Sequence, residues 1–177
     1  MINIIFRLLV MPLVFFQKFT SFYNMSVFIS RLPFSFGEKI RQEFYSKTLK
    51  KVGKGVVFSY GVIFTHKEIT IGNNVRFGPY NTIGLADFGN DILIGQFVHF
   101  LSGNKQHFYE RKDIPICKQH GEIEKIFISN DIWIGTGSII MSNISTGTVV
   151  AAGSVVVKCL EEFSVIGGNP AKVIKKR

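Results

Sequence analysis

Aliphatic and aromatic residues recur every six positions through most of the chain. Two such rows lie near the C-terminal end, formed by Ile128, Ile134, Ile140, Ile144, Val150 and Val156. A period of six fits neither the 3.6-residue repeat of a helix nor the two-residue alternation of a strand. It is typical of a parallel β-helix, in which each flat face takes one hexapeptide with its aliphatic residue inward. Small residues such as Gly135 and Ala151 follow these positions and let the chain turn at a corner.

The same pattern extends back to residue 52 and predicts five or six coils, because each coil can bury its edge only against the next. It passes through Val52, Phe58, Phe64, Ile71, Phe77, Ile83, Ile94 and Phe100. We expect the pattern to be interrupted by a short excursion at Leu85, Ala86 and Asp87. The predicted β-helix therefore spans residues 51–157.

Residues 102–125 break the period completely and are rich in charge. Loops of this length in compact proteins are usually functional or disordered. Phe108, Tyr109, Ile114 and Pro115 favour an ordered loop. We therefore predict that residues 102–125 form an ordered excursion that leaves the β-helix after one coil and rejoins it at Ile126.

Residues 1–50 form a predicted helical segment that is both apolar and basic. Its first 25 residues are interrupted by Arg7, Pro12 and Lys18, so they do not supply the roughly 20 uncharged apolar residues of a spanning helix. A basic leader and a small-residue cleavage site are also missing, which argues against a signal peptide. Pro12 is expected to end or kink any helix there. A second helix is predicted over residues 36–50, after a break at Leu32-Pro33.

Two alternatives remain open for residues 1–24. The apolar helix packs on the β-helix or on a neighbouring subunit, or it lies in a membrane interface with Arg7 and Lys18 near the lipid headgroups. At the other end, residues 158–177 form a tail of Gly, Asn, Pro and basic residues. The repeats are expected to end at Val156, and the tail to fold back along the β-helix.

The net charge of +9 over 177 residues indicates an anionic partner. Anionic lipid and a polyphosphate cofactor fit this charge, and nucleic acid has no support beyond it because no recognised binding motif is present. Cys117 and Cys159 have no metal or disulfide spacing, which favours a reduced cytoplasmic setting.

Three features together resemble the hexapeptide-repeat acetyltransferases that modify sugars and polysaccharides. They are the repeats that contain DIWIG, the terminal GNPAKVI, and the excursion HFYERKDIPICKQHGE. The resemblance covers residues 52–177 and implies an all-β fold, a left-handed parallel β-helix. It also implies acetyl-CoA as the acyl donor, no metal, a homotrimer with shared active sites, and a sugar or glycan hydroxyl as acceptor.

Acetyl transfer needs a base that removes the hydroxyl proton, and histidine suits this because it titrates near neutral pH. The resemblance assigns this role to His107, which begins the pattern of His, aromatic residue, spacer and Asp-x-Pro-Ile. His120 is the next candidate, whereas His66 and His99 lie within repeats and are read as structural. Glu122 best matches the family carboxylate that orients the base or holds the acceptor. Glu124 and Asp87 remain alternatives.

For acetyl-CoA, the resemblance points to small residues at the turns and to basic residues after the last repeat. The turn residues are Gly135, Ser138, Ala152 and Gly153, and the basic residues are Lys158, Lys172, Lys175 and Arg177. Small side chains let a pantetheine arm approach the backbone, and basic side chains can bind phosphates through charge-assisted bonds. A solvated basic tail is the alternative. Val157 replaces a threonine of the family, and Trp133 could pack at a subunit interface.

Other functions remain possible on this fold. A zinc carbonic anhydrase needs converging histidines, two of them closely spaced, and this chain lacks the close pair. A membrane-bound scaffold would explain the apolar N-terminus but not GNPAKVI. The leading prediction is O-acetylation of a surface polysaccharide unit or lipid-linked glycan precursor in the cytoplasm, with N-acetylation of an amino sugar as an alternative. Attachment to the inner face of the membrane is the further possibility.

Overall fold

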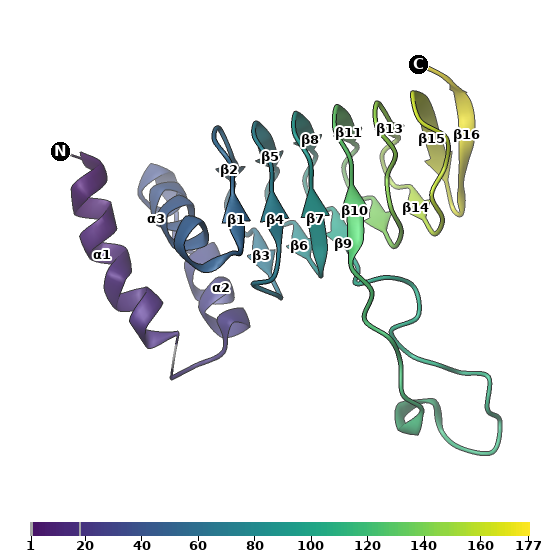
Figure 1. Cartoon of the computed structure of the whole chain (residues 1–177), viewed down its shortest axis with the longest axis horizontal. Helices are drawn as coiled ribbons and strands as arrows, with labels where there is room; N and C mark the ends of the chain where they lie inside the picture. The colour runs from purple at the N-terminus through teal and green to yellow at the C-terminus, as the bar shows by residue number, and fades with distance from the viewer. Residues whose placement is uncertain (1, 18) are drawn as a thin grey trace.

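The computed structural model describes residues 2–17 and 19–177, with side chains from Phe6 onward. Three helices come first: α1 (Ile2–Phe16), α2 (Phe22–Ser30) and α3 (Phe34–Thr48). They stack at one end of an elongated prism of short strands, and the chain ends at the other end (Figure 1). One long loop projects from the side of the prism, as the broken period predicted.

The prism has three faces, and successive coils add parallel strands to them. Face A contains β1 (Lys51–Val52), β4 (Thr70–Ile71), β7 (Ala86–Phe88) and β10 (Ile126–Ile128). Face B contains β2 (Val57–Phe58), β5 (Val75–Phe77), β8 (Ile92–Ile94), β11 (Ile132–Ile134), β13 (Val149–Val150), β15 (Ser164–Gly168) and β16 (Ala171–Lys176). Face C contains β3 (Ile63–Phe64), β6 (Thr82–Ile83), β9 (His99–Phe100), β12 (Ile139–Ile140) and β14 (Val155–Val156).

The predicted hexapeptide positions point into the prism and form its core. Phe58, Phe64, Phe77, Ile83, Ile134 and Val156 are completely buried. Aromatic rings stack through the first coils, with Phe58 and Phe77 parallel at 5.6 Å. On face B, Ile132 of β11 pairs with Ile92 of β8, which lies 40 positions earlier in the sequence. On its other side β11 pairs with β13, where the partner of Trp133 is Val149, only 16 positions later. The loop is therefore an insertion that leaves the register of the coils intact.

Two expectations about the repeats are wrong. Residues 85–87 make no excursion, because β7 (Ala86–Phe88) is a regular strand of face A and Phe88 fills the core one position early at 4% exposure. The repeats also do not end at Val156. Ile166 in β15 is 1% exposed and pairs with Val150, so the tail contributes a further rung. Beyond the Asn169-Pro170 turn, β16 returns antiparallel to β15.

The helices close the open edge of the first coil. Arg41 of α3 is 2% exposed and donates from Nε to the carbonyl oxygen of Phe58 at 2.9 Å and from Nη1 to that of Leu32 at 2.8 Å. The Tyr45 hydroxyl donates to the carbonyl oxygen of Val62, and the Ser26 hydroxyl accepts from the N–H of Phe64. An uncovered sheet edge invites pairing with other chains, and these bonds satisfy its polar groups.

Helix α1 packs on α3 and runs through Pro12, which was expected to end or kink it. Proline removes the bond to the carbonyl of the residue four before it. That residue is Leu8, which is 67% exposed. Helix α1 instead ends at Phe16, and a second helix begins at Phe22. Lys18, which figured in the membrane prediction, lies outside the described residues, as do the side chains of residues 1–5.

Candidate active site

The loop leaves the prism after β9 on face C and returns as β10 on face A (Figure 1). Its two limbs are joined by backbone hydrogen bonds. The N–H of Glu122 donates to the carbonyl oxygen of Lys105 at 2.8 Å, and the N–H of Phe108 donates to that of His120 at 2.9 Å. These bonds give the limbs a fixed register, which an unstructured loop would not have.

A glycine allows the limbs to approach so closely. A Cβ atom on Gly121 would lie 1.9 Å from the carbonyl oxygen of Gln106, far inside contact distance. The tip beyond this point is held by Gln119, whose amide nitrogen donates to the carbonyl oxygen of Arg111 at 2.8 Å. Arg111 also pairs with Asp113, and this hydrogen bond lowers the pKa of the Asp113 carboxyl. The loop is thus organised by its own contacts.

His107 and Glu122 lie on opposite limbs and line one cavity of about 380 Å³. Asn104, Lys105, Phe108, Tyr109 and Glu110 complete its lining. Both His107 and Glu122 are exposed, so a substrate hydroxyl can reach the imidazole. The two residues singled out in the sequence therefore share one site. A base and a carboxylate in one open cavity can remove a proton and hold a polar acceptor.

The neighbouring candidates lie elsewhere. His120 lines a separate cavity of about 470 Å³ near the loop tip, together with Ile114 and Lys118. Asp87 is engaged at the base of the loop, where its carboxylate accepts from Lys125 at 3.1 Å and from the N–H of Thr70 at 2.7 Å. Lys125 and Asp87 thus fasten the returning limb to face A.

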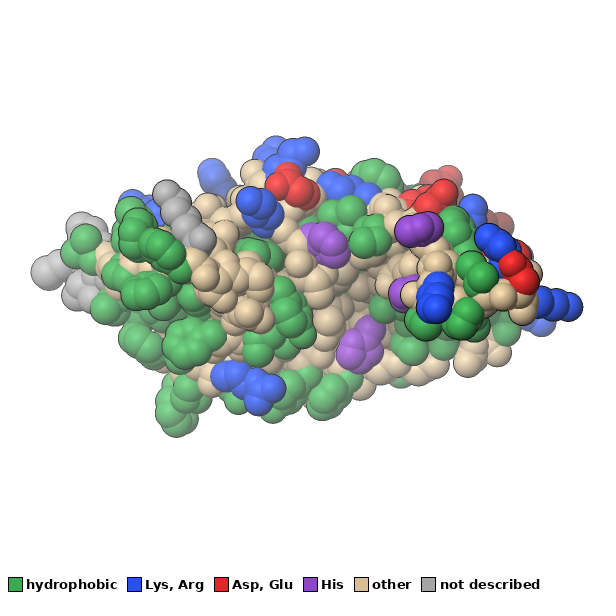
Figure 2. Space-filling model, turned by 90° about the horizontal axis from the view of Figure 1, so that it is seen from below, with side chains coloured by type: hydrophobic (Ala, Val, Ile, Leu, Met, Phe, Trp, Pro, Cys, Tyr) green, Lys and Arg blue, Asp and Glu red, His purple; other side chains and the backbone are tan. Residues whose placement is uncertain are grey.

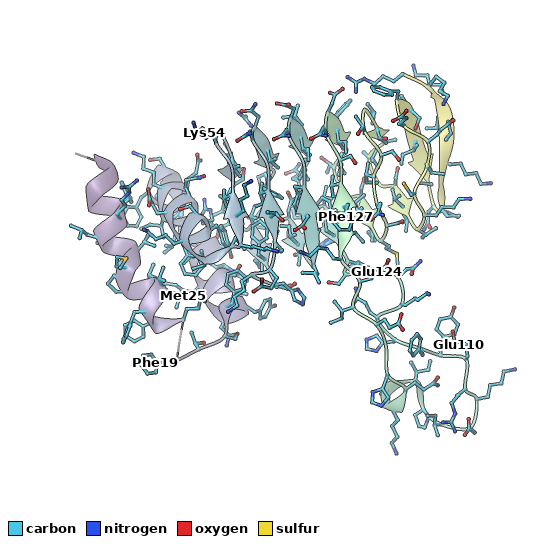
Figure 3. All side chains as sticks on the ribbon, in the orientation of Figure 1. Phe19, Met25, Lys54, Glu110, Glu124 and Phe127 are labelled. Carbon is cyan, nitrogen blue, oxygen red and sulfur yellow. The ribbon has the colours of Figure 1, made fainter. Side chains whose placement is uncertain are left out.

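The other two histidines and Glu124 also lie outside this cavity. His66 bonds through Nδ1 to the hydroxyl of Thr65 at 2.8 Å. His99 points outward from face C and lines none of the cavities described here. Glu124 lies against Gly103 at the start of the loop, and its N–H donates to the carbonyl oxygen of Ser102. Figure 3 shows Glu124 near the prism and Glu110 further out on the loop.

A third cavity, of about 400 Å³, lies where faces B and C meet. It is lined by Gly95, Trp133, Gly135, Thr136, Val149, Val150, Ala151, Ala152 and Val165. The lining is mainly apolar and small, which lets a narrow chain approach the backbone. At the adjoining corner Gly153 has a φ of +71°, and no atom lies within 4 Å of where its Cβ would be. The groove is therefore open to a narrow ligand.

Two of the residues assigned to acetyl-CoA are engaged within the chain instead. Ser138 is completely buried, and its hydroxyl donates to the carbonyl oxygen of Gly135 at 2.9 Å. The hydroxyl is therefore occupied within the chain, and the assignment of Ser138 to acetyl-CoA stays a prediction. Arg177 donates to the Asp131 carboxylate at 2.8 Å and to the carbonyl oxygen of Gly147 at 3.1 Å. The guanidinium of Arg177 is therefore not a free phosphate ligand in this structure.

The remaining basic candidates are free to bind. Lys158, Lys172 and Lys175 are exposed, and within residues 2–17 and 19–177 none of them forms an ion pair, whereas Lys176 bonds to Glu161 at 2.5 Å. Sequence reasoning missed Lys105, Tyr109 and Glu110 in the His107 cavity and Thr136 in the groove. Their positions beside His107 and Gly135 were the available signal. The described residues contain no cluster that could hold a metal ion.

Comparison with known proteins shows that the chain is similar to several acetyltransferases. Over 134 residues the chain is 31% identical to the putative colanic acid biosynthesis acetyltransferase WcaF of Escherichia coli K12, which covers 72% of this chain and 69% of that protein. It is 52% identical over 52 residues to a probable macrolide acetyltransferase of Lysinibacillus sphaericus, covering 28% and 29% of the two chains. The chain spans a quarter to a half of the length of the antibiotic acetyltransferases that it matches. No protein-family model matches the sequence.

Among solved structures, the galactoside acetyltransferase in complex with coenzyme A superposes with a TM-score of 0.73 at 22% identity. The superposition covers 98% of this chain and 82% of the other. This similarity establishes the fold as the left-handed parallel β-helix that the hexapeptide pattern and the resemblance predicted.

Proposed function

Because this chain belongs to the hexapeptide-repeat acetyltransferases, we propose that it transfers the acetyl group of acetyl-CoA to a sugar hydroxyl. The observation that carries the proposal is the cavity shared by His107 and Glu122 on a loop fixed by its own contacts. WcaF is named for colanic acid biosynthesis, which favours a glycan acceptor over an antibiotic. The acceptor proposed is a unit of a surface polysaccharide or its lipid-linked precursor.

In this mechanism His107 accepts the proton of the acceptor hydroxyl, which raises the nucleophilicity of the oxygen as it attacks the thioester carbonyl. Acetyl-CoA supplies the activated acyl group. The protonated imidazole then returns its proton to the departing sulfur. Glu122 lies across the same cavity, where its carboxylate can accept a hydrogen bond from the acceptor or from His107. Transfer is direct, since no serine or cysteine lines the cavity to act as a nucleophile.

Acetyl-CoA is proposed to bind in the groove that Gly135 and Ala152 line. Their small side chains leave room for the pantetheine arm beside the backbone. Lys172 and Lys175, both exposed on β16, are proposed to meet the phosphates, with Lys158 on the preceding turn. Gly153 forms the corner against which the arm would turn.

We propose that the protein works as a homotrimer. The loop leaves between faces C and A, whereas the groove lies between faces B and C, so the two parts of the site occupy different corners of one prism. A neighbouring prism in a ring could bring its groove to this loop, and closed cyclic symmetry would pair every loop with a groove in the same way. Trp133, exposed and lining the groove, would then lie at the interface.

The test is an assay of the purified protein with acetyl-CoA and a panel of sugars and oligosaccharides. Release of the free thiol of coenzyme A that depends on the acceptor is expected, together with a 42-dalton gain in acceptor mass by mass spectrometry. An O-acetyl product would be cleaved by mild alkali, whereas an N-acetyl product would survive and would assign the alternative activity. Absence of acetyl-CoA binding would overturn the proposal and favour a scaffold.

A further inference from the structure

The outer side of α1 is apolar although it faces solvent. Four side chains of α1 and of the turn after it are largely exposed: Leu8 at 67%, Met11 at 55%, Phe15 at 56% and Phe19 at 76%. The inner side of α1 is also apolar, since Val10 is completely buried and Leu13 and Val14 pack against the core. A helix that is apolar on both sides is normally enclosed by protein or by lipid. In the part of the chain that the structure describes, protein covers only the inner side of α1.

Exposed aromatic residues continue from α1 onto the two helices behind it. Phe28 and Phe34 are 54% and 87% exposed, and Tyr23 and Phe36 are about half exposed. Figure 2 shows hydrophobic side chains gathered over this end of the molecule, with lysine and arginine side chains at the margin. Exposed patches of this kind mark interaction surfaces on soluble proteins. Figure 3 shows Phe19 at the turn between α1 and α2, at the periphery of the molecule.

Charge is concentrated at the same end. The first 54 residues contain nine lysine and arginine residues and two acidic residues, which gives +7 of the net charge of +9. Arg7 forms an ion pair with Glu43 of α3 at 3.8 Å, and Lys39 Nζ lies 5.3 Å from the ring centre of Phe6, so both cations lie where α1 meets α3. Aromatic residues beside basic ones are the composition of surfaces that bind at the headgroup level of anionic bilayers.

We propose that the outer face of α1 and the following turn, defined by Leu8, Met11, Phe15 and Phe19, docks on the anionic surface of a membrane. The helix would lie in the plane of the interface. Among the described residues no helix has both the length and the apolar character needed to cross a bilayer. Because α1 is at the end of the prism, a ring of prisms with parallel axes would present all three copies to one flat surface (Figure 1). The basic residues would face the cytoplasmic leaflet, where anionic lipids are concentrated.

We take the partner of this face to be lipid because this end of the molecule is strongly positive. A second copy of this end would bring +7 against +7, which opposes association. An anionic bilayer instead complements the charge and accepts the aromatic side chains at its interface. Docking is independent of the chemistry at His107, so the failure of one proposal leaves the other intact.

The experiment is flotation of the full chain with vesicles of phosphatidylcholine alone or with 30% phosphatidylglycerol. The full chain should float with the anionic vesicles and less so at 0.5 M salt. Phe15→Gln with Phe19→Gln should lower the partition coefficient on the order of tenfold, because binding scales with buried apolar area. The matched control is Phe127→Gln, which removes a 52% exposed aromatic residue from face A and should float like the wild type.

A second measurement does not depend on the stability of the Phe15/Phe19 double variant. Phe19→Trp should be quenched by brominated lipid, whereas Trp133, the single tryptophan of the wild-type chain, should not. Equal flotation of the Phe15/Phe19 variant and the wild type would overturn the proposal. So would an absence of vesicle binding together with a concentration-dependent oligomer that the variant abolishes, which would assign the face to a second copy.

Discussion

Gly121 lies so close to Gln106 that a Cβ atom on the glycine would stand 1.9 Å from the glutamine carbonyl oxygen. This approach brings the limb that carries Glu122 against the limb that carries His107. Gly121→Ala should therefore push the limbs apart while leaving the prism folded. Because displacing catalytic groups by about 1 Å can cost roughly 10² in rate, we expect turnover to fall by at least tenfold, measured by thiol release from acetyl-CoA.

The control for that variant is Ile123→Ala, which changes a side chain that is 63% exposed on the same limb and does not enter the gap. It should retain turnover. Thermal unfolding of both variants should match the wild type, since the coils do not depend on the loop. Normal turnover in Gly121→Ala would mean that the spacing of the limbs has no catalytic role.

His107→Ala should lower turnover by roughly 10²–10⁴, the usual contribution of a general base. The side chain is exposed, so folding and acetyl-CoA binding should be unchanged. His120→Ala is the matched comparison, because His120 lies on the facing limb but lines a different cavity. It should retain most of its activity. The reverse outcome would transfer the role of base to His120 and to the cavity of the loop tip.

The two basic positions Lys172 and Lys175 are expected to bind cofactor phosphates. Replacing both with Gln should raise the dissociation constant of acetyl-CoA by roughly three- to tenfold at low salt, since solvent weakens exposed charge pairs. Affinity for the acceptor should not change. Calorimetric titration of acetyl-CoA measures the effect, and added salt should diminish the difference between the variant and the wild type.

Arg177→Gln is the matched control because Arg177 is already bonded to Asp131. It should leave acetyl-CoA affinity nearly unchanged and instead make β16 more sensitive to carboxypeptidase. If the Lys172 and Lys175 variant binds acetyl-CoA as tightly as the wild type, these lysines belong to a solvated end.

Burial raises the pKa of Tyr45, which is completely buried between the helices and the first coil. The folded state therefore holds the proton at pH values above about 10, where the tyrosine of the unfolded chain releases it. The contribution of Tyr45 to stability is fully present below that pH and is lost as the pH rises above it. Urea unfolding should show a decline in stability from about pH 10 upward.

Tyr45→Phe separates this effect from the hydrogen bonds of the hydroxyl. At pH 8 the variant should be less stable by about 1–3 kcal/mol, because the Val62 carbonyl and the Ser26 hydroxyl lose a partner. Between pH 10 and 12 its stability should fall less steeply than that of the wild type. Parallel pH profiles for the two proteins would show that another group governs the alkaline loss.

The hexapeptide pattern was sufficient to predict the coils because apolar residues occupy the inward positions at a fixed spacing. It failed where spacing changed. Phe88 comes five positions after Ile83, and Ile166 comes ten after Val156, yet both are buried in the prism. At Ile166 the following Gly167 was an available signal, since the aliphatic–small pair recurs there. A fixed period cannot anticipate such steps, which depend on how each corner turns.

The candidate site could likewise be predicted from the sequence only in part. The resemblance pointed to His107 and Glu122, and the structure places both at one cavity, although their roles remain predictions. It did not indicate that Ser138 would be buried or that Arg177 would bond to Asp131. These outcomes depend on contacts between coils, and residue type alone carries no information on which partner a side chain meets.

Both ends of the prism are closed, one by Arg41 and Tyr45 and the other by the antiparallel return of β16. A stack of parallel strands with bare ends would template its own extension into filaments. Here a second prism would meet helices at one end and a strand rich in lysine at the other. Removal of residues 1–49 should therefore convert this chain into a fibre-forming protein before it abolishes the coils themselves.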